Sequence, residues 1–208
     1  MLLAALAVSG CALILPPERE ARVFVQRAST YAFRIPDGWR PARSADYASV
    51  GFNRGILQRL DEPARAAFLT AGARELESHE IVLVSTRGAW IQVDSGPRAG
   101  ARVRPGQKLD ERERESLWTG WATFLTQTAP ASDTPKLTVV DMAVVDYGPN
   151  TALRVRYVAE VQRGPMRWTV LFLHGESHSA TVAHIGIPED AGEGLAGLET
   201  IARSFRFE

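Results

Sequence analysis

The sequence contains very little cysteine, no excess of either charge and no long hydrophobic run. Of its 208 residues only Cys11 carries a thiol, which excludes an intramolecular disulfide. The 24 basic residues equal the 24 acidic ones, so no overall field attracts nucleic acid or an anionic surface. The apolar stretch at residues 2–15 is shorter than the roughly 18 residues that a membrane-spanning helix requires. We therefore expect neither a nucleic-acid partner nor a transmembrane helix.

Motifs that indicate a cofactor or a catalytic centre are also missing. The chain has no phosphate-binding glycine loop, no paired-cysteine motif and no dinucleotide fingerprint. Its composition, with 45% hydrophobic and 23% charged residues, is ordinary for a globular protein. We expect no catalytic residue, no cofactor and no bound metal. We also expect residues 18–208 to form a single domain behind a leader of residues 1–17.

The apolar leader is the most informative local feature. No charged side chain precedes Glu18, and an apolar stretch of this length that ends in small residues is typical of a secretory signal. It resembles a bacterial lipobox, in which a branched residue and small residues precede a cysteine that becomes the acylated N-terminus. The matching residues are Leu6-Ala7-Val8-Ser9-Gly10-Cys11.

The lipobox resemblance implies that Cys11 is the lipidation site. Acyl chains such as palmitate would then anchor the protein to a membrane of the cell envelope, facing the periplasm. Ala12 is similar to the residue that directs known lipoproteins to the outer membrane. An ordinary signal peptide, an uncleaved short anchor and a buried structural cysteine are the alternatives.

Hydrophobic periodicity predicts a mixture of strands and helices. Alternation in residues 31–35 predicts a strand that ends in a turn before Trp39. Asp110 and Glu113 have the spacing of a capping box, which predicts a helix over residues 110–127. The other expected strands are residues 81–86, 89–93, 137–146, 152–162, 167–174 and 180–187, and the other expected helices are residues 60–76 and 195–205.

The spacing of these elements predicts the fold class. Short glycine-containing turns join the last four expected strands, which favours an antiparallel meander. Residues 139–145 are apolar on both faces of their strand, so helices must cover the sheet on both sides. The sequence therefore predicts an α/β fold of the α+β type, with an α/β/α sandwich around a mainly antiparallel sheet.

Two segments resemble the opening and closing motifs of PsbP-like domains, and the meander fits the same layout. The segments are Tyr31-Ala-Phe33-Arg-Ile35-Pro36-Asp-Gly38-Trp39 and Ile201-Ala-Arg-Ser204-Phe205-Arg-Phe207. Family members include extrinsic photosystem subunits, a Ran-binding nuclear-transport protein and many bacterial lipoproteins, and most known members bind proteins rather than catalyse reactions. The resemblance implies a PsbP-like fold and an accessory role with an envelope protein partner. It assigns no functional residue to a position of this chain.

His174, Glu176 and His178 are the densest group of metal-ligating residue types. Two imidazoles and a carboxylate are donors that zinc sites use, so the alternative function is an envelope hydrolase or a metal-dependent enzyme. On a helix the two histidines would share a face, but Gly175 predicts a hairpin turn. The two function classes therefore differ in whether these side chains converge with another acid or imidazole in one pocket.

The remaining candidates favour structural interpretations. His184 lies on an expected strand and is predicted to be a hydrogen-bonded core residue, whereas His79 is predicted to lie in a solvated connection. Trp118 and Trp121 recur at helical spacing, which favours packing over a ligand platform. The basic segment 96–108 is expected to be a solvated loop, and its alternative role is contact with anionic headgroups, cell-wall polymer or an acidic partner.

Overall fold

A seven-stranded sheet dominates the computed structural model, which describes residues 22–26, 31–49, 53, 57–97, 102–128, 135–161, 164–176, 178–186 and 191–207. In order across the sheet, the strands are β3 (Trp39–Pro41), β4 (Ile81–Ser85), β5 (Trp90–Pro97), β9 (His178–Gly186), β8 (Gly164–His174), β7 (Asn150–Val161) and β6 (Lys136–Tyr147). Every neighbouring pair is antiparallel. The residues of the leader, including Cys11, lie outside the described ranges.

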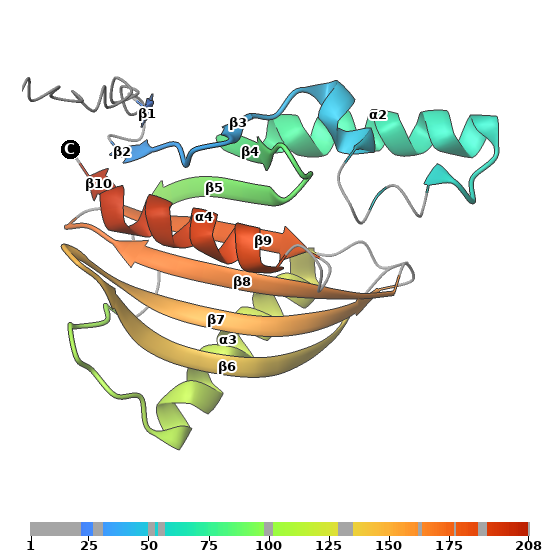
Figure 1. Ribbon diagram of the computed structural model, residues 1–208. Helices are drawn as coiled ribbons and strands as arrows, with labels where there is room; N and C mark the ends of the chain where they lie inside the picture. Colours follow the sequence, from blue (N-terminus) through green and yellow to red (C-terminus); the bar gives the residue numbers. More distant parts are fainter. Residues whose placement is uncertain are drawn as a thin grey trace, which may run out of the picture.

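Strands β6 to β9 form the meander that the sequence predicts (Figure 1). They follow one another through connections of a few residues, which are too short for the crossover that a parallel pair needs. In the turn between β6 and β7, Gly148 has a φ of +76°, a left-handed conformation that glycine adopts without steric cost. The predicted hairpin of β4 and β5 is also confirmed.

A second, three-stranded sheet has the order β1 (Val23–Gln26), β2 (Tyr31–Arg34) and β10 (Arg206–Phe207). The alternation of residues 31–35 predicted β2, whereas β1, β3 and β10 were not predicted. These strands are 4, 3 and 2 residues long. Because so few residues show little periodicity, only their partners in the sheet identify them as strands.

The helices begin at side-chain caps that the sequence contains. Asp61 precedes α2 (Glu62–Ser78) and accepts a hydrogen bond of 2.9 Å from the backbone N–H of Ala64. The predicted capping box precedes α3 (Glu111–Thr128): Glu113 N–H donates to Asp110 at 2.8 Å, and Asp110 N–H donates to Glu113 at 2.9 Å.

Two further helical segments are η1 (Ser44–Ala48), a 3-10 helix, and α4 (Ala191–Ser204). None of the helices in the described part of the chain combines the length and the hydropathy needed to cross a membrane.

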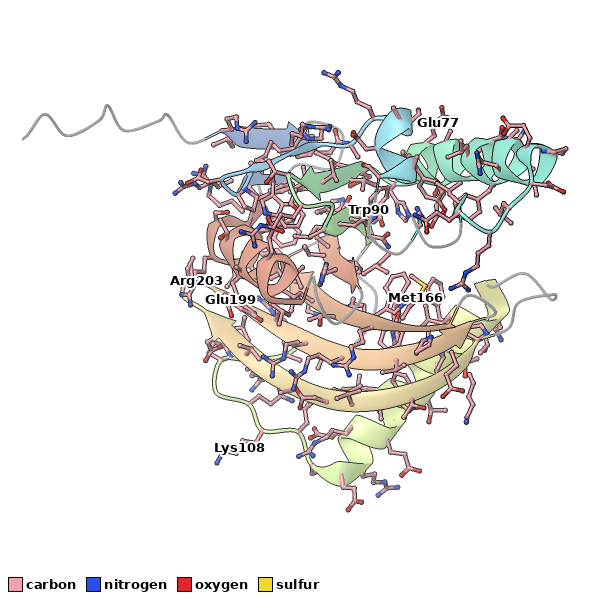
Figure 2. All side chains as sticks on the ribbon, turned by 45° about the vertical axis from the view of Figure 1, so that its right-hand side comes forward. Glu77, Trp90, Lys108, Met166, Glu199 and Arg203 are labelled. Atoms are coloured by element: carbon pink, nitrogen blue, oxygen red, sulfur yellow. The ribbon has the colours of Figure 1, made fainter. Side chains whose placement is uncertain are left out.

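Helices cover both faces of the large sheet, which confirms the predicted α/β/α sandwich. Figure 1 shows α4 in front of the sheet and α3 behind it. Residues of α4 and β2 share one core cluster with β4, β5 and β8. Residues of α3 pack on the opposite face against β6, β7 and β8, and those of α2 pack there beside β4 and β5. Trp90 and Met166, which Figure 2 labels, belong to the cluster beside α2.

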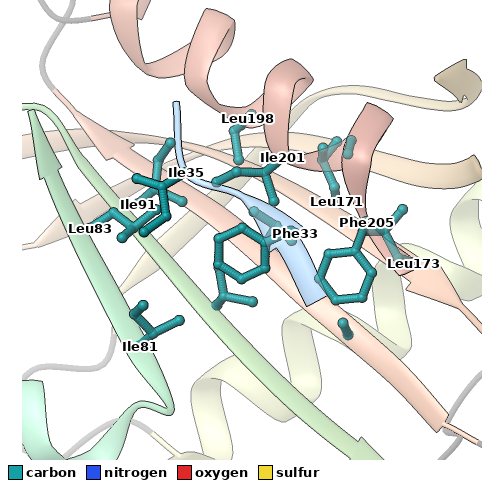
Figure 3. Packing of buried hydrophobic residues seen from close by; sticks show 14 of the residues in the cluster. Phe33, Ile35, Ile81, Leu83, Ile91, Leu171, Leu173, Leu198, Ile201 and Phe205 are labelled. Atoms are coloured by element: carbon teal, nitrogen blue, oxygen red, sulfur yellow. The ribbon is translucent and has the colours of Figure 1, made fainter. Parts of the chain in front are cut away.

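The front core is built around aromatic residues from both ends of the described chain. Figure 3 shows Phe33 and Phe205 among aliphatic side chains of α4 and the large sheet. Phe33 is 0% exposed, Trp39 is 3% exposed and Phe205 is 1% exposed. All three residues belong to one buried cluster, so the opening and closing motifs, which lie far apart in sequence, meet in the same core.

Helix α4 can approach the sheet closely because glycines face it. A Cβ on Gly194 would lie 2.2 Å from the imidazole of His184, and a Cβ on Gly197 would lie 2.7 Å from Ile91. His184 is 4% exposed, and its Nδ1 lies 2.9 Å from the carbonyl oxygen of Trp90. The prediction of a hydrogen-bonded core histidine is therefore confirmed.

Candidate functional site

The His174 turn does not have the geometry of a metal site. Strand β8 ends at His174 and β9 begins at His178, so the predicted hairpin is confirmed. His174 pairs with Ser179 in the ladder, and successive residues of a strand point to opposite faces. The side chains of His174 and His178 therefore lie on opposite faces of the sheet. Within the described ranges, no group of three or more histidine, cysteine, aspartate or glutamate side chains is placed to hold a metal ion.

A cavity of about 770 Å³ between α3 and the back of the large sheet is the strongest candidate site. We call it the α3 cleft. Its floor comes from strands β5 to β9, and one wall comes from the helix. Its volume falls within the roughly 300–1,000 Å³ of small-molecule sites, and most of its lining side chains are hydrophobic or aromatic, as such sites usually are.

The strand register explains why the floor of the α3 cleft is polar on one side and apolar on the other. Across the sheet, Asp94 pairs with Thr181, Thr181 pairs with Phe172, and Phe172 pairs with Leu153. Side chains in such a row project from the same face. The β5 and β9 side therefore presents polar groups, and the β8 and β7 side presents hydrocarbon.

The adjacent row has the same polarity. Gln92 pairs with Ala183, Ala183 pairs with Val170, and Val170 pairs with Val155. The amide of Gln92 thus lies on the same side as Asp94 and Thr181, and all three line the cleft. The polar edge therefore runs along β5 through Gln92 and Asp94, with Thr181 of β9 beside Asp94.

Helix α3 leaves room at the mouth of the cleft. Ser116, Gly120 and Phe124 follow one another at a spacing of four residues, so they share one side of the helix, and all three line the cavity. A Cβ on Gly120 would meet no atom within 4 Å. The Phe124 side chain is 52% exposed, which leaves an aromatic ring at the entrance.

Trp121 forms the aromatic wall of the cleft. Its ring centroid lies 5.0 Å from that of Phe172 in an edge-on arrangement. Its indole N–H is buried and faces Tyr157 without meeting hydrogen-bond geometry. Burial raises the pKa of Tyr157, and the neighbouring indole opposes that rise. Trp118 packs on Tyr157 as predicted, whereas Trp121 both packs in the core and lines the site.

His79 lies in a connection as predicted, between α2 and β4, but the expectation that it is solvated was wrong, because its side chain closes the polar edge of the cleft. Its side chain is 19% exposed, and Nδ1 lies 2.8 Å from Oδ2 of Asp94. The hydrogen bond to Asp94 raises the pKa of His79 above 6.5 against the opposing effect of burial, and the charges of Asp94 and Glu75 act in the same direction as the hydrogen bond. The error arose because Asp94 is brought to His79 only by the β4–β5 hairpin.

The carboxylates at this edge, those of Asp94 and Glu80, accept hydrogen bonds from neighbouring groups of the protein. Oδ1 of Asp94 accepts a hydrogen bond of 3.1 Å from the backbone N–H of Glu80. The carboxylate of Glu80 accepts bonds from Ser95 Oγ at 2.8 Å and from the Tyr31 hydroxyl at 2.7 Å. Burial and the interaction with Glu80 both raise the pKa of Tyr31. Both oxygens of Asp94 therefore have partners inside the protein.

Two other cavities are weaker candidates for a ligand site. One of about 770 Å³ lies at the β3 edge, where Arg40 forms two hydrogen bonds of 2.6 Å with Asp46, so this cation is already paired. A smaller cavity of about 380 Å³ is bordered by Arg102 and Arg104, both exposed. Of the basic segment, residues 96–97 belong to β5 and residues 98–101 lie outside the described residues. Residues 102–108 are mostly exposed, but Val103 is buried in the cluster beside α3, so the predicted solvated loop is confirmed only in part.

Sequence reasoning missed the α3 cleft, although weak signals were present. Gly120 interrupts an otherwise strongly periodic helix, and such a glycine indicates a packing or functional reason. Gln92 and Asp94 are polar residues in a strand of buried apolar ones. Neither signal indicated a cleft by itself, because β5 lies beside β9 through a pairing between residues about 90 positions apart.

These features define a mixed α/β protein with the PsbP-like fold and an apolar cleft behind its sheet. The solution structure of cyanobacterial PsbP from Synechocystis aligns with 99% of this chain and 99% of its own, with a TM-score of 0.50 at 14% identity. At this identity the similarity shows the fold alone. No family model matches the sequence, and no curated protein matches it.

Two further solved structures are similar at lower scores. LpqN of Mycobacterium tuberculosis, described as involved in cell envelope biogenesis, covers 91% of this chain and 86% of its own at 9% identity, with a TM-score of 0.43. A mutant of the protein Mog1 covers 91% of this chain and 96% of its own at 13% identity, with a TM-score of 0.40.

Proposed function

We propose that this protein is a membrane-tethered binding module of the bacterial cell envelope that holds an apolar ligand in the α3 cleft. The observation that carries the proposal is the cavity of about 770 Å³ whose floor changes from polar to apolar across the sheet. Such a site buries most of a small ligand and orients it with a few polar groups. The PsbP-like fold, whose known members mostly bind proteins rather than catalyse reactions, is compatible with a binding role.

The cleft supports binding better than catalysis. Asp94, the only acidic residue among the described residues that line the cleft, has a hydrogen-bond partner on each carboxylate oxygen, so it already has a structural role. His174 borders the cleft, but His178 faces away from it across the sheet. A hydrolase or metal-dependent enzyme that uses this turn needs both imidazoles on the same face of the sheet. Successive residues of a strand alternate between the two faces, which argues against this alternative.

The tether is supported by the lipobox resemblance at Cys11. Stable attachment through acyl chains requires at least two of them, each buried methylene contributing about 0.8 kcal/mol. The domain would then face the periplasm on its anchor, and Ala12 supports sorting to the outer membrane. An envelope protein that receives or delivers the ligand is the partner that we propose.

Lipidation is tested by mass spectrometry of the mature N-terminus and by membrane fractionation of the wild type and Cys11→Ser. We expect the wild type to begin at an acylated Cys11 and to need detergent for extraction. The variant should remain folded and lack the acyl chains. A wild-type protein that is soluble, unacylated and cleaved beyond Cys11 would contradict the tether.

Binding in the cleft is tested with the uncharged apolar dye Nile red, whose fluorescence rises in apolar surroundings. Gly120→Leu should reduce its binding at least tenfold, because the new side chain occupies open space at the mouth of the cleft. The change also favours the helix by up to about 1 kcal/mol, so loss of binding would not reflect unfolding. Thr119→Leu on the same helix is the matched control, since Thr119 does not line the cleft. Equal binding by both variants would refute the site.

A further inference from the structure

We infer that the ligand of the α3 cleft is an amphiphile with one acyl chain and an uncharged head that bears hydroxyl groups. This inference rests on the proposed function and specifies its ligand. It follows from three properties of the cleft: its volume, the division of its floor into polar and apolar sides, and the kind of polar groups that it contains.

The volume limits the ligand to a single chain. A water molecule takes up roughly 30 Å³ in the liquid, and a methylene group is of similar size. A cavity of about 770 Å³ thus holds on the order of 25 such groups. One acyl chain with a small head has this size, whereas a two-chain phospholipid exceeds it.

The division of the floor orients that ligand. Leu153, Val155, Val170 and Phe172 form a hydrocarbon surface on β7 and β8, and Trp121 lies above it on α3. An acyl chain placed there contacts apolar groups along its length. The head then lies over β5 and β9, one or two strands away in the same register rows.

The polar groups beneath the head are neutral donors and acceptors. Gln92 supplies an amide, and Thr181 and Ser179 supply hydroxyls. Each of these groups can both donate and accept a hydrogen bond, which matches the hydroxyls of a head such as glycerol.

The charges of the cleft argue against an ionic head. Among the described lining residues there is no lysine or arginine, and the His79 imidazole is already paired with Asp94, so a carboxylate or phosphate would be buried without a free counter-charge, which is costly. A cationic head would find one described lining carboxylate, that of Asp94, whose two oxygens are already bonded to His79 and to the backbone of Glu80. An uncharged head avoids both penalties.

The test compares three amphiphiles with the same twelve-carbon chain, each below its micelle concentration: 1-monolauroylglycerol, laurate and dodecyltrimethylammonium. Displacement of Nile red from the full chain carrying Cys11→Ser reports their binding, because this variant has no acyl chains of its own to compete. We expect monolauroylglycerol to bind at least tenfold more tightly than either ion. Gly120→Leu should abolish the binding, and Thr119→Leu should keep it.

Two variants at the polar edge test the head directly. Thr181→Val removes a hydroxyl, so it should weaken the binding of monolauroylglycerol several-fold more than it weakens the binding of Nile red. Gln92→Lys supplies the missing cation, so it should shift the preference toward laurate. Tighter binding of laurate or of dodecyltrimethylammonium by the Cys11→Ser chain would overturn the uncharged head and leave the cleft as a binding site. Binding of neither Nile red nor any amphiphile would overturn the proposed function itself.

Discussion

Phe205 joins the C-terminal helix to both sheets, and its replacement tests the core most directly. Its side chain is 1% exposed. The ring centroid lies 5.1 Å from that of Tyr31 and 5.9 Å from that of Phe33, in stacked arrangements. The Asn150 side chain also donates a hydrogen bond of 2.8 Å to the backbone carbonyl of Phe205. Phe205→Ala removes the ring and leaves this backbone contact in place.

The magnitude follows from these contacts. Truncation of a buried phenylalanine to alanine lowers the free energy of unfolding by about 3–5 kcal/mol, because a cavity remains. Each stacked aromatic pair contributes about 0.5–1.5 kcal/mol beyond the buried area. Since Phe205 forms two such pairs, we expect a loss of about 4–5 kcal/mol. Domains are typically stable by about 5–15 kcal/mol, so the variant should be severely weakened.

Urea denaturation followed by tryptophan fluorescence measures this loss. Phe124→Ala is the matched control, because it removes the same ring from a side chain that is 52% exposed. Phe124→Ala loses one stacked contact, with Trp121 at 5.4 Å between ring centroids, but alanine is the better helix former, so the control should lower the free energy of unfolding by at most about 1 kcal/mol. A loss below about 1 kcal/mol for Phe205→Ala, or equal losses for the two variants, would refute this account of the core.

Further predictions concern α4 and the polar edge of the cleft. Gly194→Ala should cost about 1–3 kcal/mol in urea denaturation, because its Cβ would lie 2.2 Å from the His184 ring. Gly192→Ala, with nothing within 4 Å of its Cβ, should be neutral or stabilising, and the reverse order would contradict the packing of α4. Asp94→Asn should lower the pKa of His79 in an NMR titration, since the hydrogen bond to Asp94 raises it above 6.5. Because the pKa of His79 is raised in the folded state, the stability that the pair contributes is complete below about pH 6.5 and is lost as the pH rises through the folded pKa. The difference in the free energy of unfolding between the wild type and Asp94→Asn should therefore narrow at alkaline pH. A stability difference that widens at alkaline pH would contradict a raised pKa for His79.

The sequence predicted features whose causes are local or periodic. The capping box of Asp110 and Glu113 appears in the structure with both hydrogen bonds. Glycine turns and alternating apolar residues predicted the meander of β6 to β9, because each strand pairs with its neighbour in the chain. Short strands such as β10 were missed, because two residues carry no period.

The sequence by itself determined the long elements, the sandwich class and the lipobox pattern around Cys11, since each depends on neighbouring residues along the chain. Only the tertiary structure decided which side chains meet. It placed His174 and His178 on opposite faces, and it brought His79 to Asp94. The α3 cleft exists because β5 pairs with β9 and α3 packs behind them, and such contacts depend on how distant segments bury their apolar faces together rather than on any local pattern.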